Sequence, residues 1–427
     1  MARQLLEADR SVRFSARGDV RAAVERIGRA EDLCFSPDGT KLAIAGLAVE
    51  RLLILDVEAR LAEDGPQVAL TGFLEIECAA FHYPHGLAWT DESTVIVANR
   101  EGAITIIALP DAPSGSRVKV EPLRLIGTDG TELIRTPGSV AAMSVGMGLI
   151  ELLVCNNFVD HVSRHLLDRR RGYEVIASEI LIGEGLGVPD GVAHGPSGRW
   201  IALSNHDHHT VLLLRNNAQP SSTLEPAGVL TGVSYAHGIK FTRDGRCLLV
   251  ADAGAPFVRI FASETGEWSG RREPSGEIRV TSDATFAREN HSPSEGGPKG
   301  IDLILDNALM AVSCAHYPLA FFDMRGLIPA NDAASSLAER ASEDERVRAA
   351  LVRALAAAAG RTAQETEALR RAGEHDRRAL ADSRAELRKT FASRSWKLTL
   401  PLRWANGHRT RLAQRAGRRL QKGGGRD

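Results

Sequence analysis

Short apolar runs recur along residues 30–325 and predict β-strands. Each run follows the same local pattern: a small residue or Pro, then a variable residue, then Gly or another small or polar residue. Six copies begin at residues 30, 84, 137, 189, 236 and 298. Their variable residues are 54, 53, 52, 47 and 62 positions apart, close to the length of a four-stranded propeller blade. The pattern predicts an all-β fold, a six-bladed β-propeller over residues 1–330.

Further apolar runs supply the other strands of each predicted blade. Residues 42–45 and 52–55, for example, follow the first copy, and 200–204 and 211–214 follow the fourth. Turns rich in Pro, Asp and Gly separate them, as between antiparallel strands. The sixth repeat has no obvious fourth strand before Pro329. We therefore expect the extended segment Ser11–Phe14 to complete that blade and close the ring.

The composition changes after Pro329 to Ala, Arg, Glu and Leu, which favour helix. We expect helices near 337–358 and 363–391, separated by Gly360, within a helical or coiled-coil segment at 331–391. Charged residues interrupt the apolar stripe, so any coiled coil should be short. Residues 392–427 are predicted to form a basic amphipathic tail.

Charge is distributed unevenly along the chain. The whole chain has 53 basic and 54 acidic residues, but residues 333–427 hold 22 basic and only 11 acidic ones. Residues 388–427 combine twelve Lys and Arg with Trp396, Trp404 and several Leu. This mixture predicts binding to an anionic membrane surface. No nucleic-acid-binding module is visible, so we expect no nucleic acid partner.

The chain has no sequence signal for export. No apolar stretch approaches the roughly 18–20 residues of a membrane span, and Met1–Arg13 lacks the apolar run of a signal peptide. The five cysteines are widely spaced, without a Cys-x-x-Cys pair, which indicates reduced thiols. We expect a cytoplasmic protein, peripheral on the inner face of the membrane.

The repeat places chemically active side chains together. Equivalent positions of propeller blades lie at the same height of the central channel. One ring should therefore contain the six variable residues Glu31, His85, Gly138, Asp190, His237 and Lys299. The second strands return to the same face, which should bring polar residues at their ends close to the ring: Asn99, Asn156, Asn205, Asp252 and His316.

Carboxylates and imidazoles at one channel mouth suit a divalent metal ion. The predicted ligands are Glu31, His85, Asp190 and His237, with Ca²⁺, Mg²⁺, Mn²⁺ and Zn²⁺ all left open. Lys299 would contact an anion. The alternative is a polar, water-filled mouth without a metal, since fold alone does not give function.

A histidine cluster follows the second strand of the fourth repeat. Within Asn205–His209, the side chains of His206 and His208 would share one face of a strand and could bind a ligand. An exposed turn is the alternative. Together with His85, Lys299 and the strand-end residues Asn99, Asn156, Asn205 and Asp252, these two form the predicted site for a small polar ligand.

The repeats Pro84–Ala88, Pro189–Ala193 and Ala236–Ile239 resemble those of six-bladed propellers of the gluconolactonase, regucalcin and lactonase type. The resemblance covers roughly residues 30–325. It implies a divalent metal at the mouth, held by a Glu, an Asn from Pro-Asn-Gly and an Asp from Pro-Asp-Gly. Glu31 and Asp190 match the acidic ligands, whereas no Pro-Asn-Gly is present. The resemblance implies metal-dependent hydrolysis of a lactone or sugar ester as one candidate function.

A second resemblance lies in the tail. Ser395–Arg403 is similar to the C-terminal segment of many bacterial glycosyltransferases of surface-polysaccharide assembly, with Lys397 and Leu400 in place of the usual Arg and Ala. It implies a ligand-binding or scaffold protein of O-antigen or capsule biosynthesis. Its implied partners are glycan-assembly enzymes, and the implied ligand of the propeller is a carbohydrate-like small molecule. Whether the propeller is itself an enzyme stays open at this point.

Overall fold

The computed structural model describes residues 10–127, 133–216, 225–288, 295–314 and 317–328. All of them belong to one compact unit, Met1–Ala363. The helices expected near 337–358 and 363–391, and the tail at 392–427, lie outside the described residues.

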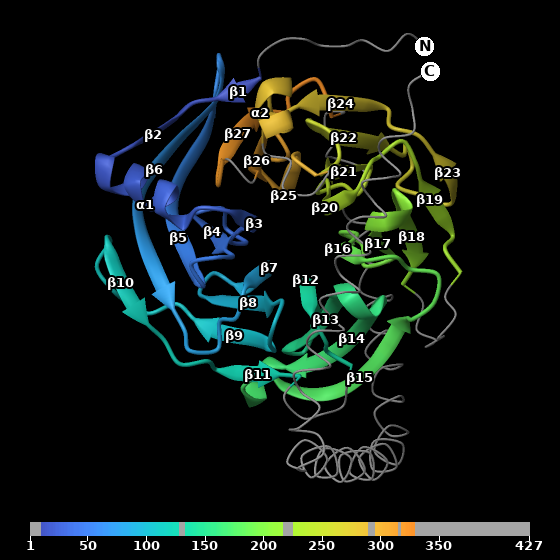
Figure 1. Cartoon of the computed structure of the whole chain (residues 1–427), viewed down its shortest axis with the longest axis horizontal. Helices are drawn as coiled ribbons and strands as arrows, with labels where there is room; N and C mark the ends of the chain where they lie inside the picture. The colour runs from blue at the N-terminus through green and yellow to red at the C-terminus, as the bar shows by residue number, and fades with distance from the viewer. Residues whose placement is uncertain (1–9, 128–132, 217–224, 289–294, 315–316, 329–427) are drawn as a thin grey trace, which may run out of the picture. The chain divides into compact units, whose positions relative to one another are not determined.

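The described strands form six sheets around a central axis (Figure 1). The innermost strands are β3 (Ala30–Phe35), β7 (Pro84–Asp91), β12 (Pro137–Gly146), β16 (Pro189–His194), β20 (Ala236–Phe241) and β25 (Pro298–Ile304). Each contacts the next, and β25 contacts β3. The ring is therefore closed, which confirms the six-bladed propeller.

Each innermost strand is followed outward by two antiparallel neighbours. The second strands are β4 (Lys41–Gly46), β8 (Thr94–Asn99), β13 (Leu149–Asn156), β17 (Trp200–Asn205), β21 (Cys247–Asp252) and β26 (Leu309–Cys314). The third are β5 (Arg51–Ala62), β9 (Ile104–Ala108), β14 (His161–Asp168), β18 (Thr210–Arg215), β22 (Phe257–Ala262) and β27 (Ala320–Asp323). These strands contain the apolar runs predicted from the sequence.

The outer strands are more varied. They are β6 (Gly65–Glu77), β11 (Arg124–Ile126), β15 (Glu174–Ile182), β19 (Gly228–Leu230), β24 (Gly276–Arg279) and β1 (Ser11–Val12). Three further strands pair in parallel with outer strands of the first and fourth blades: β2 (Phe14–Ala16), β10 (Ser116–Lys119) and β23 (Gly270–Arg272).

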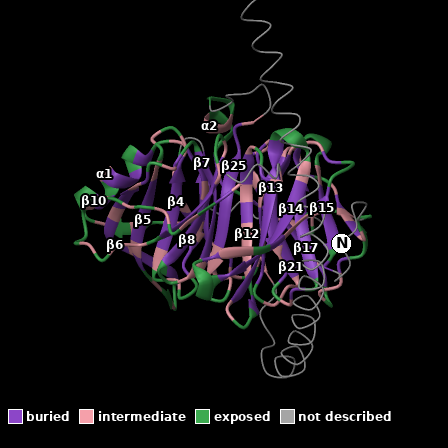
Figure 2. Ribbon diagram, turned by 90° about the horizontal axis from the view of Figure 1, so that it is seen from below, coloured by how far each residue is buried: buried purple, intermediate pink, exposed green. Residues whose placement is uncertain are grey.

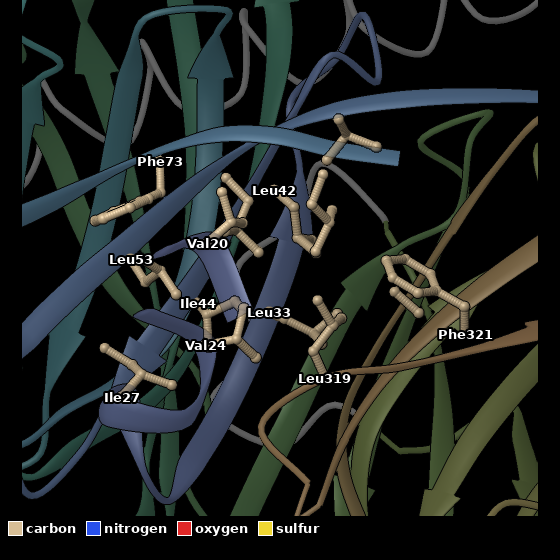
Figure 3. Close-up of a cluster of buried hydrophobic side chains, with 14 of the residues drawn as sticks. Val20, Val24, Ile27, Leu33, Leu42, Ile44, Leu53, Phe73, Leu319 and Phe321 are labelled. Atoms are coloured by element: carbon tan, nitrogen blue, oxygen red, sulfur yellow. The ribbon is translucent and has the colours of Figure 1, made fainter. Parts of the chain in front are cut away.

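A buried hydrophobic cluster fills each interface between neighbouring blades. Buried residues accordingly run along the strands, whereas exposed ones concentrate in the turns (Figure 2). Figure 3 shows the cluster between the first and sixth blades, which contains Leu33 and Leu42 of the first blade and Phe321 of the sixth. Full burial of a Leu or Phe side chain contributes about 1.5–3 kcal/mol, so these interfaces supply most of the stability.

The N-terminal strand closes the ring, as predicted from the missing strand of the sixth repeat. Ser11 and Val12 in β1 pair antiparallel with Phe322 and Phe321 of β27. The rest of the segment turns to the first blade, where Phe14 in β2 pairs in parallel with β6. The sixth blade is thus built from both ends of the propeller sequence.

Two α-helices lie outside the sheets among the described residues. The helix α1 (Gly18–Ile27) buries Val20, Ala23, Val24 and Ile27 against the first blade, and α2 (Asp283–Arg288) is a short surface helix. Three short 3₁₀ helices are η1 (Asn157–Val159), η2 (Arg169–Arg171) and η3 (His206–His208). In the part of the chain that the structure describes, no helix has the length and apolar character needed to span a bilayer.

Candidate functional site

Every innermost strand begins with an irregular step in its pairing. In β3 the regular register is lost between Ala30 and Leu33, and the same shift occurs at the start of the other five strands. The variable residue of each repeat lies within this bulge. Because a bulge redirects a side chain away from the regular alternation, the repeat presents one residue per blade to the channel mouth.

The backbone before these strands is also unusual. Tyr83, Thr136, Val188 and Tyr235 each immediately precede an innermost strand and have φ of 55°, 46°, 50° and 58°. A positive φ is costly for β-branched residues such as Thr136 and Val188. The residue that leads into each of these four strands therefore has a strained backbone conformation, which the surrounding packing must stabilise.

Three ring residues from three blades converge. Nε2 of His85 lies 3.5 Å from Oε2 of Glu31, and Nε2 of His237 lies 3.7 Å from the same oxygen. One donor atom from each of the three residues falls within 4.8 Å of the others. The two imidazole rings are stacked with centroids 5.6 Å apart, and all three side chains are almost completely buried.

The hydrogen bonds of His85 determine which of its nitrogens is available. Nδ1 of His85 lies 2.6 Å from the carbonyl oxygen of Gly138, so Nδ1 carries the proton and donates it. Nε2 is then a lone-pair acceptor, and it is buried without a hydrogen-bond partner. It faces the carboxylate of Glu31, which is also an acceptor. A cation between the two would satisfy both.

Burial and charge set the protonation of this group. Burial, reinforced by Arg100, lowers the pKa of His85 to about 4, and burial with Lys299 lowers the pKa of His237 to about 3. Burial alone would raise the pKa of Glu31, but electrostatic interactions with His85, Lys299 and Arg29 outweigh it and lower that pKa to about 2. At neutral pH the site therefore holds two neutral imidazoles and a carboxylate, the protonation states that metal ligands require.

Asp190, the fourth predicted metal ligand, lies beside the triad. Its Oδ2 is 3.0 Å from Nε2 of His237. Its Oδ1 accepts a hydrogen bond from Nδ2 of Asn157 and lies 3.6 Å from Nη2 of Arg100. Burial opposes ionisation of Asp190, but His237, His85 and Arg100 together lower its pKa far below the usual range. It belongs to the wall of the site rather than to the group of three converging donors.

A cavity of about 330 Å³ opens above these residues. Lys299, the predicted anion contact, lines it with its ammonium paired to Glu295. His206 lines it too, with Nδ1 at 2.9 Å from Asp207 and Nε2 at 3.3 Å from Glu295. Burial lowers the pKa of His206, but hydrogen bonds to Glu295 and Asp207 outweigh this and raise it.

The predicted strand-end residues have a different role. Asn99, Asn156, Asn205 and Asp252 are buried, and each accepts a hydrogen bond from the backbone N–H two residues before the innermost strand of its own blade. The donors are His82, Arg135, Gly187 and Ser234. These four side chains therefore hold the strained segments that precede the innermost strands, and they do not line the cavity. The side chain of His208 contacts Asn205, also outside the cavity, and His316 lies outside the described residues.

The residues that reach the mouth are instead the next ones along the chain. Arg100 and His206 line the cavity, and Asn157 bonds Asp190. Each of these three residues directly follows the last residue of a second strand, so one position separates a structural side chain from a site side chain.

Asn157 also occupies the ring position that Gly138 leaves without a side chain. A Cβ on Gly138 would lie 1.8 Å from Oδ1 of Asn157. The glycine at this ring position was the sequence signal that a side chain from another part of the chain could fill the space. Arg29 and Glu295 were likewise missed, because they lie outside the repeated positions.

The opposite end of the channel contains a larger cavity of about 980 Å³, lined by all six innermost strands. Its width follows from small residues such as Ala88, Ala141 and Ala193 in the lining. Its Lys240 is paired with Asp302 at 2.5 Å. We assign the candidate site to the mouth with the smaller cavity because the possible metal-ligand atoms of Glu31, His85 and His237 converge there.

Comparisons with known proteins add little about function. No protein-family model matches the sequence, and no curated protein matches it. Among solved structures, "Kuenenia stuttgartiensis Hydrazine Synthase" is 15% identical with a TM-score of 0.43, over 69% of this chain and 84% of that one.

Proposed function

We propose that this propeller binds one divalent cation at the channel mouth through Glu31, His85 and His237, and binds a carbohydrate ligand beside it. The observation that carries the proposal is the buried Nε2 of His85, which lacks a hydrogen-bond partner and faces the Glu31 carboxylate at 3.5 Å. Two buried acceptors without a donor between them are costly. A bound cation removes that cost and would supply Lewis acidity to a ligand.

The donor atoms fit a small cation. Ligands about 2.0–2.1 Å from a tetrahedral Zn²⁺ lie roughly 3.4 Å apart. The separations of 3.5 and 3.7 Å from Oε2 of Glu31 to the two imidazoles are close to this value. Imidazole ligands favour Zn²⁺ over Ca²⁺, Mg²⁺ and Mn²⁺, which prefer oxygen ligands.

Exposed aromatic side chains on the mouth side support a carbohydrate ligand. Tyr83 precedes β7, Phe158 follows β13 and Tyr317 follows β26, with 43%, 61% and 40% of their surface exposed. Aromatic faces with polar groups nearby suit ligands that have both apolar faces and hydroxyls.

The setting that we propose is bacterial surface-polysaccharide assembly, with glycan-assembly enzymes as partners and the basic tail on an anionic membrane. Its support is the sequence similarity of Ser395–Arg403 alone. A second function, hydrolysis of a lactone or sugar ester, is favoured by one contact, the Asp190 carboxylate 3.0 Å from His237 at the edge of the triad. Release of acid from a sugar δ-lactone by the cation-loaded protein would favour hydrolysis over binding alone.

The test is equilibrium dialysis of the full chain against Zn²⁺ and Mn²⁺, with metal content measured per chain. We expect one tightly held ion in the wild type and at least a hundredfold weaker binding in His85→Ala, because one of three ligands is lost. His208→Ala is the matched control, since His208 lies on the same face but outside the cavity. Equal metal content in wild type and His85→Ala would rule out the proposed site.

A further inference from the structure

Arg100 has hydrogen-bonding capacity that the protein itself does not use. It follows Asn99 at the end of β8 and lines the 330 Å³ cavity at the mouth. Its guanidinium lies over the ring of Phe158, 5.3 Å from the centroid. Stacking of this kind fixes the plane of a guanidinium and leaves its edge free to donate.

The nearest acidic group does not satisfy Arg100. Nη2 of Arg100 lies 3.6 Å from Oδ1 of Asp190, which is longer than a hydrogen bond, and that oxygen already accepts from Asn157. Nε of Arg100 is buried and has no hydrogen-bond partner. A buried donor without an acceptor is unfavourable, and a ligand in the cavity can supply the missing acceptor.

The other described cations of the cavity are already engaged. Arg29 contacts Glu31, and Lys299 contacts Glu295. His206 has a carboxylate oxygen within 3.3 Å of each ring nitrogen, from Asp207 and from Glu295.

We infer that the ligand carries an oxyanion, a carboxylate or a phosphate, and that Arg100 binds it. Planar guanidinium groups pair with such oxyanions through two parallel hydrogen bonds. The assignment rests on the proposed function for the carbohydrate part of the ligand. The anion specificity rests on Arg100 and its unused donors.

Calorimetric titration of the full chain with three matched sugars tests the inference. Glucose, glucuronate and glucose 6-phosphate share one ring and differ in charge. We expect the wild type to bind at least one of the two anions tenfold or more tightly than glucose. Arg100→Gln should abolish that preference, and Arg100→Lys should restore part of it because the charge returns without the planar fork.

Arg215→Gln is the control variant. Arg215 also lies over an aromatic ring, that of Trp200 at 4.7 Å, but it is paired with Glu267 and does not line the cavity. Metal content of each variant, measured in parallel, separates loss of anion binding from failure of the cation site. The inference is overturned if neither anion binds more tightly than glucose. It is also overturned if Arg100→Gln keeps the preference for the anion and is thus indistinguishable from the control Arg215→Gln.

Discussion

Single glycine residues determine how closely neighbouring blades approach at the channel. The residue after the ring position is Gly in four of the six copies, at Gly86, Gly191, Gly238 and Gly300. A Cβ on Gly191 would lie 2.0 Å from the carbonyl oxygen of His237, and one on Gly238 would lie 2.4 Å from that of Lys299. The Gly of the repeat is therefore required by backbone contact between blades, which explains why it recurs beside the ring.

We expect Gly191→Ala to lower the free energy of unfolding by about 3 kcal/mol, because overpacking against a backbone cannot be relieved by a rotamer change. Urea denaturation measures the change. Gly18→Ala is the control, since nothing lies within 4 Å of its added Cβ and its site is helical, where Ala is favoured. Equal stability of the two variants would show that the blades have room to separate at Gly191.

The ring could be predicted from sequence at this scale because its residues repeat. Glu31, His85 and His237 occupy one position of the pattern, and the structure brings them together. The strand-end residues show the limit of the method. The repeat correctly identified the level of Asn99 in the fold, but the local bulge and turn decide that Arg100, one residue later, faces the cavity. That choice depends on backbone geometry between blades, which no single sequence window contains.

Among the elements, the strands were predictable and the additions to them were not. The second strands are apolar runs that are buried throughout, so their pattern is strong. The helix α1 has no side-chain cap at Arg17, and Asp19 in its first turn is a weak start signal. The strand β10, Ser116–Lys119, is polar and short, and it forms because β6 extends far enough to pair with it.

The N-terminal strands are expected to contribute strongly to stability. Val12 and Phe14 pack against the cluster shared by the first and sixth blades, and Phe14 contacts Phe321 edge-on at 5.8 Å. Removal of residues 1–16 should cost about 3 kcal/mol or more, from two lost apolar side chains. It also exposes the edge of β27, which favours aggregation.

Urea denaturation and light scattering measure these effects of the N-terminal truncation. A shorter truncation that removes residues 1–9 keeps β1 and β2 and is the control. Matching stability of the two truncated proteins would contradict closure of the ring by β1.

At the scale of the whole molecule, the six blades meet around ionisable groups, so protonation near the channel changes the stability of the entire fold. The pKa values of His85 and His237, lowered by burial to about 4 and about 3, mean that between pH 5 and 6 only the unfolded chain protonates these imidazoles. The contribution of these two histidines to the free energy of unfolding is therefore lost as the pH falls below about 6.5. Asp32 acts in the opposite direction, because burial raises its pKa to about 7 and the folded state keeps a proton that the unfolded chain releases.

From these three groups alone, the unfolded state binds about one proton more than the folded state in this interval. The free energy of unfolding of the cation-free protein should fall by about 1 kcal/mol per unit as the pH is lowered from 6 to 5. His237→Gln removes one imidazole and should flatten this dependence, whereas Asp32→Asn removes the opposing group and should roughly double it. Urea denaturation in a metal chelator at constant ionic strength measures the three slopes. Parallel slopes for all three proteins would mean that the buried imidazoles are protonated in the folded state, which would also remove the basis for a cation site at the mouth.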